Sequence, residues 1–162
     1  MTTTPKYKTR TTYSKRNLLS GVLFGIGLAA FIDETVFHQL LHWHHFYDKS
    51  TTSVGLVSDG LFHAFSWFAT IWAGFLFSDL RRRNALVIKV WAAGLLLGAG
   101  GFQFYDGTLQ HKIMRIHQIR YNVDIFPYDL TWNIIAAVMI LSGAYLLLRS
   151  QQKARYEGGP AN

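Results

Sequence analysis

The sequence has no cysteine and little charge, and both absences narrow the function classes. Without cysteine there can be no disulfide, no thiolate metal site and no cysteine nucleophile. Charged residues make up 15% of the chain, against about 25% in an average soluble protein. Hydrophobic residues make up 50% of the 162 residues. A disordered, collagen-like or coiled-coil chain is therefore excluded, and a chain that enters a membrane is favoured.

Four apolar stretches are each long enough to cross a bilayer as a helix. A bilayer core of about 30 Å needs about 20 helical residues. The four stretches run over about residues 18–41, 60–80, 86–105 and 130–148. We therefore predict an all-α fold, an integral membrane four-helix bundle over residues 18–149. A basic cytoplasmic tail, 1–17, precedes it and a second cytoplasmic tail, 150–162, follows it.

Basic residues are concentrated on one side of these stretches. Twelve of the 16 are Lys6, Lys8, Arg10, Lys15, Arg16, Arg81, Arg82, Arg83, Lys89, Arg149, Lys153 and Arg155. The positive-inside rule then predicts that both termini and the 81–83 connection face the cytoplasm. Topology and anionic lipid account for the basic clusters, so no nucleic acid partner is predicted. A cleaved signal peptide ending near Ile32 is the alternative, which an internal repeat in this segment disfavours.

The two halves of the chain share the pattern G-x3-G-x-G-x3-F-x-D-x4-H-x5-H, repeated without a gap. The first copy consists of Gly21, Gly25, Gly27, Phe31, Asp33, His38 and His44. The second copy consists of Gly94, Gly98, Gly100, Phe104, Asp106, His111 and His117, each at the same offset from its counterpart. More weakly, Asp59-x3-His63 recurs as Asp129-x3-Asn133, at a slightly shorter offset. We therefore predict two parallel-repeat helical hairpins, about 18–80 and 86–148, whose glycines let the first and third helices approach closely.

Acidic and histidine side chains are expected at one depth, near the outward face. Asp33 follows Leu18 by 15 residues, which is about 22 Å along a helix. Isolated carboxylates at that depth are costly, so they must pair, bind an ion or line water. Histidine is the commonest metal ligand, and carboxylates commonly complete such sites. The predicted metal ligands are Asp33, His38, His42, Asp59, His63, Asp106, His111 and His117.

Helical spacing ranks the histidines within this set. His38 and His42 are four residues apart, which predicts a shared helix face. His44 and His117 are weaker candidates, because each follows the preceding repeat histidine by six residues and leaves that face unless the helix ends. The alternative to a metal site is a hydrogen-bonded Asp–His network that conducts protons. The aromatic residues near this level are interpreted as an interfacial belt, namely Trp43, Phe46, Tyr47, Trp67 and Tyr128.

The sequence has no cysteine, and Met114 is the only methionine near this level, so a soft thioether Cu(I) site is disfavoured. Imidazole with carboxylate favours zinc or copper as the metal, with iron as a further option. Two twofold-related histidines could also hold a b-type haem, but haem needs a wide apolar slot and ranks third. The sequence has no P-loop, H-E-x-x-H, G-x-S-x-G or dinucleotide-binding motif.

Three stretches resemble a family of predicted bacterial four-helix membrane proteins of unknown function. They are GLAAFIDETVFHQLLHWHH (Gly27–His45), DGLFHA (Asp59–Ala64) and GGFQFYDGTLQHKIMRIHQ (Gly100–Gln118). With the segments between them, the resemblance covers about residues 18–148. The first motif usually reads Asp-Gly in that family, whereas here it reads Asp33-Glu34, which adds a carboxylate. The resemblance implies a multi-pass protein of the bacterial inner membrane with Asp/His-rich motifs, and no established reaction.

Two classes of function follow from these observations. The first is a metal-dependent membrane enzyme, in which a metal-bound water or oxygen species acts on a small or lipid-like substrate. The second is a copper- or proton-handling transport protein linked to respiratory oxidase assembly, since the family is similar in kind to proteins encoded near oxidase-assembly factors. Four short spans are few for a monomeric transporter, so this second hypothesis predicts a homodimer. A b-haem electron carrier is the third alternative.

Overall fold

The computed structural model describes the backbone of residues 5–156 and the side chains of residues 14–152. These residues are all-helical and contain no strand, as predicted. The elements, in chain order, are α1 (Pro5–Asp33), η1 (Glu34–Leu40), α2 (Thr52–Arg82), α3 (Ile88–Phe104), η2 (Tyr105–Met114) and α4 (Phe126–Tyr156). The segments η1 and η2 are π-helical and continue α1 and α3 without a break.

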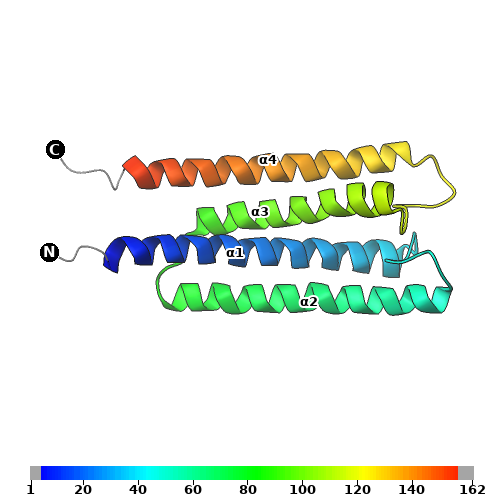
Figure 1. Cartoon of the computed structure of the whole chain (residues 1–162), viewed down its shortest axis with the longest axis horizontal. Helices are drawn as coiled ribbons and strands as arrows, with labels where there is room; N and C mark the ends of the chain where they lie inside the picture. Colours follow the sequence, from blue (N-terminus) through cyan, green and yellow to red (C-terminus); the bar gives the residue numbers. More distant parts are fainter. Residues whose placement is uncertain (1–4, 157–162) are drawn as a thin grey trace.

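The four α-helices lie side by side along one long axis (Figure 1). In that view α1 and α3 run in one direction and α2 and α4 in the other. Helix α1 packs against α2 and α3, and α3 also packs against α4. The two described ends of the chain lie at one end of the bundle, and the connections 41–51 and 115–125 lie at the other (Figure 1).

Glycines allow the close approach of α1 and α3. A methyl group at Gly21 would overlap the carbonyl oxygen of Trp91, and one at Gly94 would lie 2.5 Å from the carbonyl oxygen of Leu18. Small residues bring helix backbones together in membranes, where packing and hydrogen bonds replace the hydrophobic driving force. The predicted contact between the first and third helices is therefore present.

Polar side chains fix the end of the bundle that carries the termini. Asn17 is fully buried; its amide nitrogen donates to the carbonyl of Ala85 at 2.9 Å, and its oxygen accepts from the Val87 amide at 2.7 Å. Arg16 forms an ion pair with Asp79 at 2.7 Å. These bonds hold the 83–87 connection against α1. The side chains of Lys6, Lys8, Arg10, Lys153 and Arg155, which the charge argument uses, lie outside the described residues.

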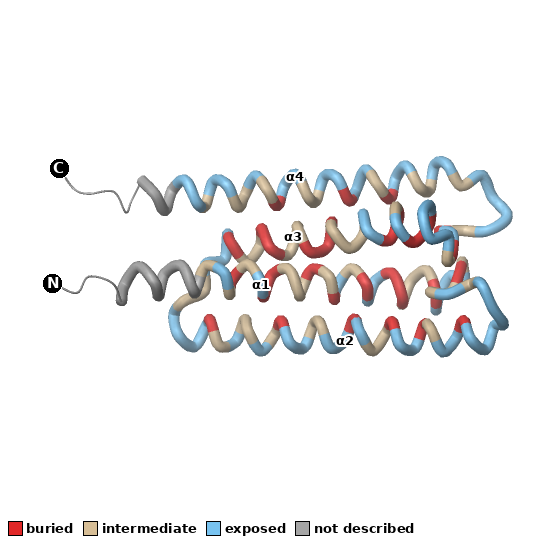
Figure 2. The backbone as a smooth tube through the Cα atoms, viewed as in Figure 1, coloured by how far each residue is buried: buried red, intermediate tan, exposed pale blue. Residues whose placement is uncertain are grey.

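The outward faces of the helices are apolar, as a lipid-facing surface requires. On α2, Phe68 and Phe75 are each 73% exposed, and on α4, Leu141 is 69% exposed. The buried positions of α2 and α4 face the centre of the bundle (Figure 2). Exposed aromatic and aliphatic side chains of this size mark a surface covered by another apolar phase.

Among the described residues, three helical segments are long and apolar enough to cross a membrane, where four were predicted. They are Ser14–Leu40, Thr52–Arg82 and Phe126–Gln152. The predicted span at 86–105 is not among them, because α3 has only 17 residues of regular α-helix and holds four glycines. Helix α3 lies between α1 and α4 and continues as η2, in which Asp106, Gly107, Gln110 and His111 are buried.

Candidate metal centre

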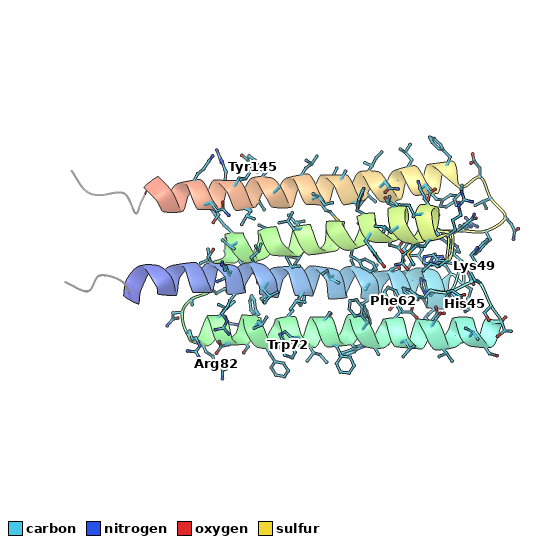
Figure 3. The ribbon with its side chains drawn as sticks, viewed as in Figure 1. His45, Lys49, Phe62, Trp72, Arg82 and Tyr145 are labelled. Carbon is cyan, nitrogen blue, oxygen red and sulfur yellow. The ribbon has the colours of Figure 1, made fainter. Side chains whose placement is uncertain are left out.

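The candidate centre lies where η1 and η2 end and the two connections fold back over them. Figure 3 shows the labelled residues His45, Lys49 and Phe62 toward this end, away from Arg82. Asp59 anchors the first connection: its carboxylate accepts from the Phe46 amide at 2.7 Å and pairs with His45 Nδ1 at 2.6 Å. The connection is therefore held back against α2 and carries His44 inward.

The π-helical segments explain the five-residue spacing of Asp and His in the repeated pattern. In a π-helix the hydrogen bonds join residues five apart, so residues five apart lie on one face. Asp33 and His38 are five apart, as are Asp106 and His111. In an α-helix such pairs would diverge; here all four side chains are buried, none more than 6% exposed.

The first half of the chain contributes three carboxylates around His38. Its Nδ1 lies 2.9 Å from Glu34 Oε2 and 3.1 Å from Asp59 Oδ1, and its Nε2 lies 3.7 Å from Asp33 Oδ2. One Nδ1 proton can be donated to only one of these two close oxygens, and Glu34 Oε2 is left without a hydrogen bond. Three carboxylates around one imidazole repel one another if they are ionised, and a positive charge among them would stabilise them.

The second half of the chain gathers two histidines on Asp106. His111 Nε2 lies 3.1 Å from Asp106 Oδ2, and His117 Nε2 lies 3.4 Å from Asp106 Oδ1. Neither His nitrogen, nor Asp106 Oδ2, has a hydrogen-bond partner among the described residues.

His44 and His117 form the middle of the cluster. Their rings stack with centroids 4.7 Å apart and planes 4° apart. His44 Nδ1 lies 3.0 Å from the carbonyl oxygen of Ile119, and His117 Nδ1 lies 2.9 Å from that of Phe46. A carbonyl can only accept, so both Nδ1 atoms carry a proton, and in a neutral ring Nε2 then presents its lone pair.

Four ring nitrogens of this buried cluster thus have no hydrogen-bond partner among the described residues. They are the Nε2 atoms of His38, His44, His111 and His117. Three groups of side chains have ligand atoms within 4.8 Å of one another: His44–His111–His117, Asp33–His38–His44 and Glu34–His38–Asp59. Two ligands each about 2.1 Å from one tetrahedral ion lie roughly 3.4 Å apart. The nitrogen–oxygen distances of 3.1, 3.4 and 3.7 Å fit this value.

Burial keeps the central imidazole neutral. Loss of hydration, together with the neighbouring His38 and His117, lowers the pKa of His44 to about 2. His44 is therefore uncharged at any ordinary pH, which is the form of imidazole that binds a metal.

The comparisons with known proteins agree with the helical, lipid-facing surface. A family model described as a predicted membrane protein, DUF2243, matches residues 20–150. The chain belongs to the DUF2243 family. No curated protein and no solved structure matches this DUF2243 chain. The predicted membership of a membrane protein family of unknown function is thus confirmed, and the family description supplies no reaction.

Six of the eight predicted ligands come together in this DUF2243 protein. They are Asp33, His38, Asp59, Asp106, His111 and His117. His42 does not join them: the helical segment ends at Leu40, so the expected helix face is lost, and His42 is exposed with a φ of 51°. His63 is also apart, because it is half-buried and its Nε2 accepts from the Trp67 indole at 3.1 Å.

Sequence reasoning underrates His44 and leaves Glu34 and His45 out of the ligand set. The low rank of His44 rests on α-helical geometry, which does not apply because the helical segment ends at Leu40. The repeat holds the missing signal, since it pairs His44 with His117, a predicted ligand. His45 lies beside Asp59, and nothing in its spacing distinguishes it from an interfacial residue.

Proposed function

We propose that this protein is a membrane metalloprotein with a resident transition-metal centre at the end of the bundle that carries the connections 41–51 and 115–125. The single observation that carries the proposal is the cluster of four Nε2 atoms that lie beside buried carboxylates and form no hydrogen bond within the described part of the chain. Each imidazole of the stacked pair is oriented by a backbone carbonyl, as metal-binding histidines usually are. Nitrogen and oxygen donors without sulfur favour zinc, copper or iron.

Burial supports a resident ion rather than a transported one. The cluster histidines are at most 6% exposed, and Asp33, Glu34, Asp59 and Asp106 at most 3%. A transported ion must enter and leave, which needs exposed or mobile ligands. We therefore favour a metal-dependent membrane enzyme over a copper- or proton-handling protein, and the homodimer of that second hypothesis stays a prediction.

Ring geometry disfavours the haem alternative. The four cluster imidazoles have neighbouring centroids 4.4–6.2 Å apart. Two axial ligands of one haem lie on opposite faces of a porphyrin and need a wide apolar slot between the helices. Rings that contact one another across the centre leave no room for that slot.

We also propose that the bundle consists of two duplicated hairpins related by a pseudo-twofold axis. Reciprocal contacts support this: His44 pairs with the Ile119 carbonyl and His117 with that of Phe46, and Ile119 is the repeat counterpart of Phe46. Likewise a methyl at Gly27 would meet Thr70, and one at Gly100 would meet Ala136 and Ile140. Ile140 is the repeat counterpart of Thr70, because the two are separated by the same offset as Asp129 and Asp59, which is the predicted offset of the second helices.

Elemental analysis of protein purified without added metal tests the metal centre. We expect about one or two ions per chain, as the donor set suffices for one or two sites. The double variant His44→Ala/His117→Ala should lose them, because it removes the two central ligands. The matched control His42→Ala/His63→Ala should keep them, because neither side chain joins the cluster.

The outcome is decided by metal content together with folding. Circular dichroism should show unchanged helicity in both double variants. Wild-type protein that is fully helical and contains no metal would overturn the proposal and favour the hydrogen-bonded network. Equal metal content in the two double variants would also contradict it.

A further inference from the structure

A groove lies between α1, α2 and α3, in the part of the bundle that crosses the membrane. Its volume is about 660 Å³. Its lining is apolar almost throughout, and includes Val22, Leu61, Phe65, Leu97 and Phe102. From Ser58 to Phe65 it follows α2 for seven residues, or about 10 Å. A groove of this kind opens to lipid, so its natural occupant is an apolar chain from the bilayer.

One end of the groove is polar. Gln110 lines it, is 1% exposed, and its Oε1 has no hydrogen-bond partner among the described residues. A buried acceptor without a donor is costly, so a bound group that donates a hydrogen bond would be stabilised there.

The polar end also adjoins the metal centre. Phe46 and Phe62 line the groove and stack on each other at 4.7 Å. Behind the groove, the ring of Phe62 lies beside that of His38, with centroids 5.7 Å apart. The ring of Phe46 lies beside that of His117, with centroids 6.2 Å apart. One layer of aromatic rings therefore separates the groove from the histidines.

Both halves of the chain line the groove, but the open space and the unpaired acceptor come from the second half alone. Gly101 leaves open space, since a methyl group there meets nothing within 4 Å. At the matching positions of the first half, Leu28 and Phe37 replace Gly101 and Gln110. Phe37 packs against Trp132 with ring centroids 5.5 Å apart. The open space and the unpaired acceptor thus occur together, where the two halves differ.

We propose that the groove binds a single-chain lipid whose head group donates a hydrogen bond to Gln110, with the hydroxyl of a lipid alcohol as the simplest case. The chain lies over Gly101 between α2 and α3, and the head lies against the Phe46–Phe62 layer. That this lipid is the substrate of the metal centre depends on the proposed function. That it binds in the groove does not.

Photolabelling tests the groove with a defined probe, a diazirine-bearing dodecanol added to the full-length protein in detergent. Saturable labelling should map to peptides that contain Phe62 and Phe102. Gly101→Leu should reduce it about tenfold, because leucine fills the space of several methylene groups. The matched control Gly74→Leu should leave it unchanged, since a methyl at Gly74 also meets nothing within 4 Å and Gly74 does not line the groove.

The head group is tested by competition between dodecanol and dodecyl methyl ether, which cannot donate a hydrogen bond. Wild-type protein should prefer dodecanol by about tenfold, as expected for satisfying a buried acceptor. Gln110→Met, which keeps a similar volume, should abolish the preference and retain labelling. Equal labelling of wild-type and Gly101→Leu, or no preference in the wild type, would overturn the proposal.

Metal content measured on the same samples separates the two proposals. Gly101→Leu that loses labelling but keeps its metal supports the groove as a distinct site. Wild-type protein that contains no metal but shows the expected labelling overturns the metal centre and supports the lipid site.

Discussion

Glu34 and Gly107 occupy matching positions in the two halves and differ most in chemistry. A methyl group at Gly107 would lie 2.6 Å from Cδ1 of Trp132, so any side chain there would require this tryptophan to move. In the first half Phe62 stands at the position that matches Trp132, and Glu34 is accommodated. The exchange gives His38 a third carboxylate neighbour, beside Asp33 and Asp59, and makes the two ends of the cluster unequal.

Asp106 should be more important for metal binding than Asp129. Asp106 lies within 3.4 Å of two cluster histidines, whereas Asp129 is 3.8 Å from His111 and pairs with Lys112 at 3.2 Å. We expect Asp106→Asn to weaken metal affinity about 10- to 100-fold or more, the usual effect of losing a ligand's carboxylate partner. Competition with a chelator measures this. Asp129→Asn is the control, and an equal loss in both variants would contradict the assignment.

Asp59 should act mainly by holding the first connection. It meets the Phe46 amide, His38 Nδ1 and His45 Nδ1 within 3.1 Å. Asp59→Asn leaves a buried donor without its acceptor, so we expect a loss of about 1–3 kcal/mol in the free energy of unfolding. Denaturant titration in micelles measures it. Asp124→Asn, on the exposed second connection, should change stability little.

At the scale of the elements, the two π-helical segments decide where the acids and imidazoles point. They place Asp33 with His38 and Asp106 with His111, and both end where a connection turns back. Wide π turns are rare and occur frequently at functional sites. The same side chains on regular α-helices would be spread around the helix rather than gathered at the centre.

The α1–α3 contact should tolerate no side chain at Gly21. A methyl group there would overlap the Trp91 carbonyl, and backbone atoms cannot move aside as a flexible side chain would. We expect Gly21→Leu to cost roughly 3 kcal/mol or more of stability and to lower the yield of folded protein. Thermal unfolding followed by circular dichroism measures it. Gly60→Leu, where a methyl meets nothing within 4 Å, is the control. Equal stability of the two variants would contradict the close packing.

On the scale of the whole molecule, the fold separates a basic end from an end rich in acids and histidines. Arg16, Asp79 and Arg83 form ion pairs at the first, and the cluster lies near the second. Both described chain ends lie at the basic end (Figure 1). The positive-inside rule predicts this distribution of basic residues for a protein whose termini are cytoplasmic.

The absence of cysteine allows a direct test of topology. Lys49→Cys and Arg120→Cys lie in the two connections near the cluster, and Arg82→Cys lies at the opposite end. We expect a membrane-impermeant maleimide to label the first two variants on intact spheroplasts, and Arg82→Cys only after lysis. Labelling of Arg82→Cys before lysis would contradict cytoplasmic termini.

Metal removal should destabilise the whole bundle. An ion that binds the folded state at a hundred times its dissociation constant adds about 2.7 kcal/mol of stability. Chelation should therefore lower the melting temperature by roughly 5–10 °C for a chain of this size. Differential scanning fluorimetry before and after chelation, and again after metal is restored, measures it. The His44→Ala/His117→Ala variant should show no such shift.

The sequence by itself determined the helices, the apolar surface and the pairs of residues that repeat. Runs of apolar side chains can bury themselves only as helices in lipid, and the fixed offset predicted that Asp33, His38, Asp106 and His111 would share one level. Three segments rather than four meet the length and hydropathy of a span, and α3, with 17 residues of regular α-helix, is the one left out.

Only the tertiary structure decided which side chains meet. The spacing of His38 and His42 indicated one helix face, but the helical segment ends at Leu40 and a positive φ turns His42 outward. His44 reaches the centre because Asp59, on α2, holds the connection that carries it, and no local pattern encodes that contact. Periodicity follows from bonds along one helix, whereas the cluster depends on where separate segments end and fold back.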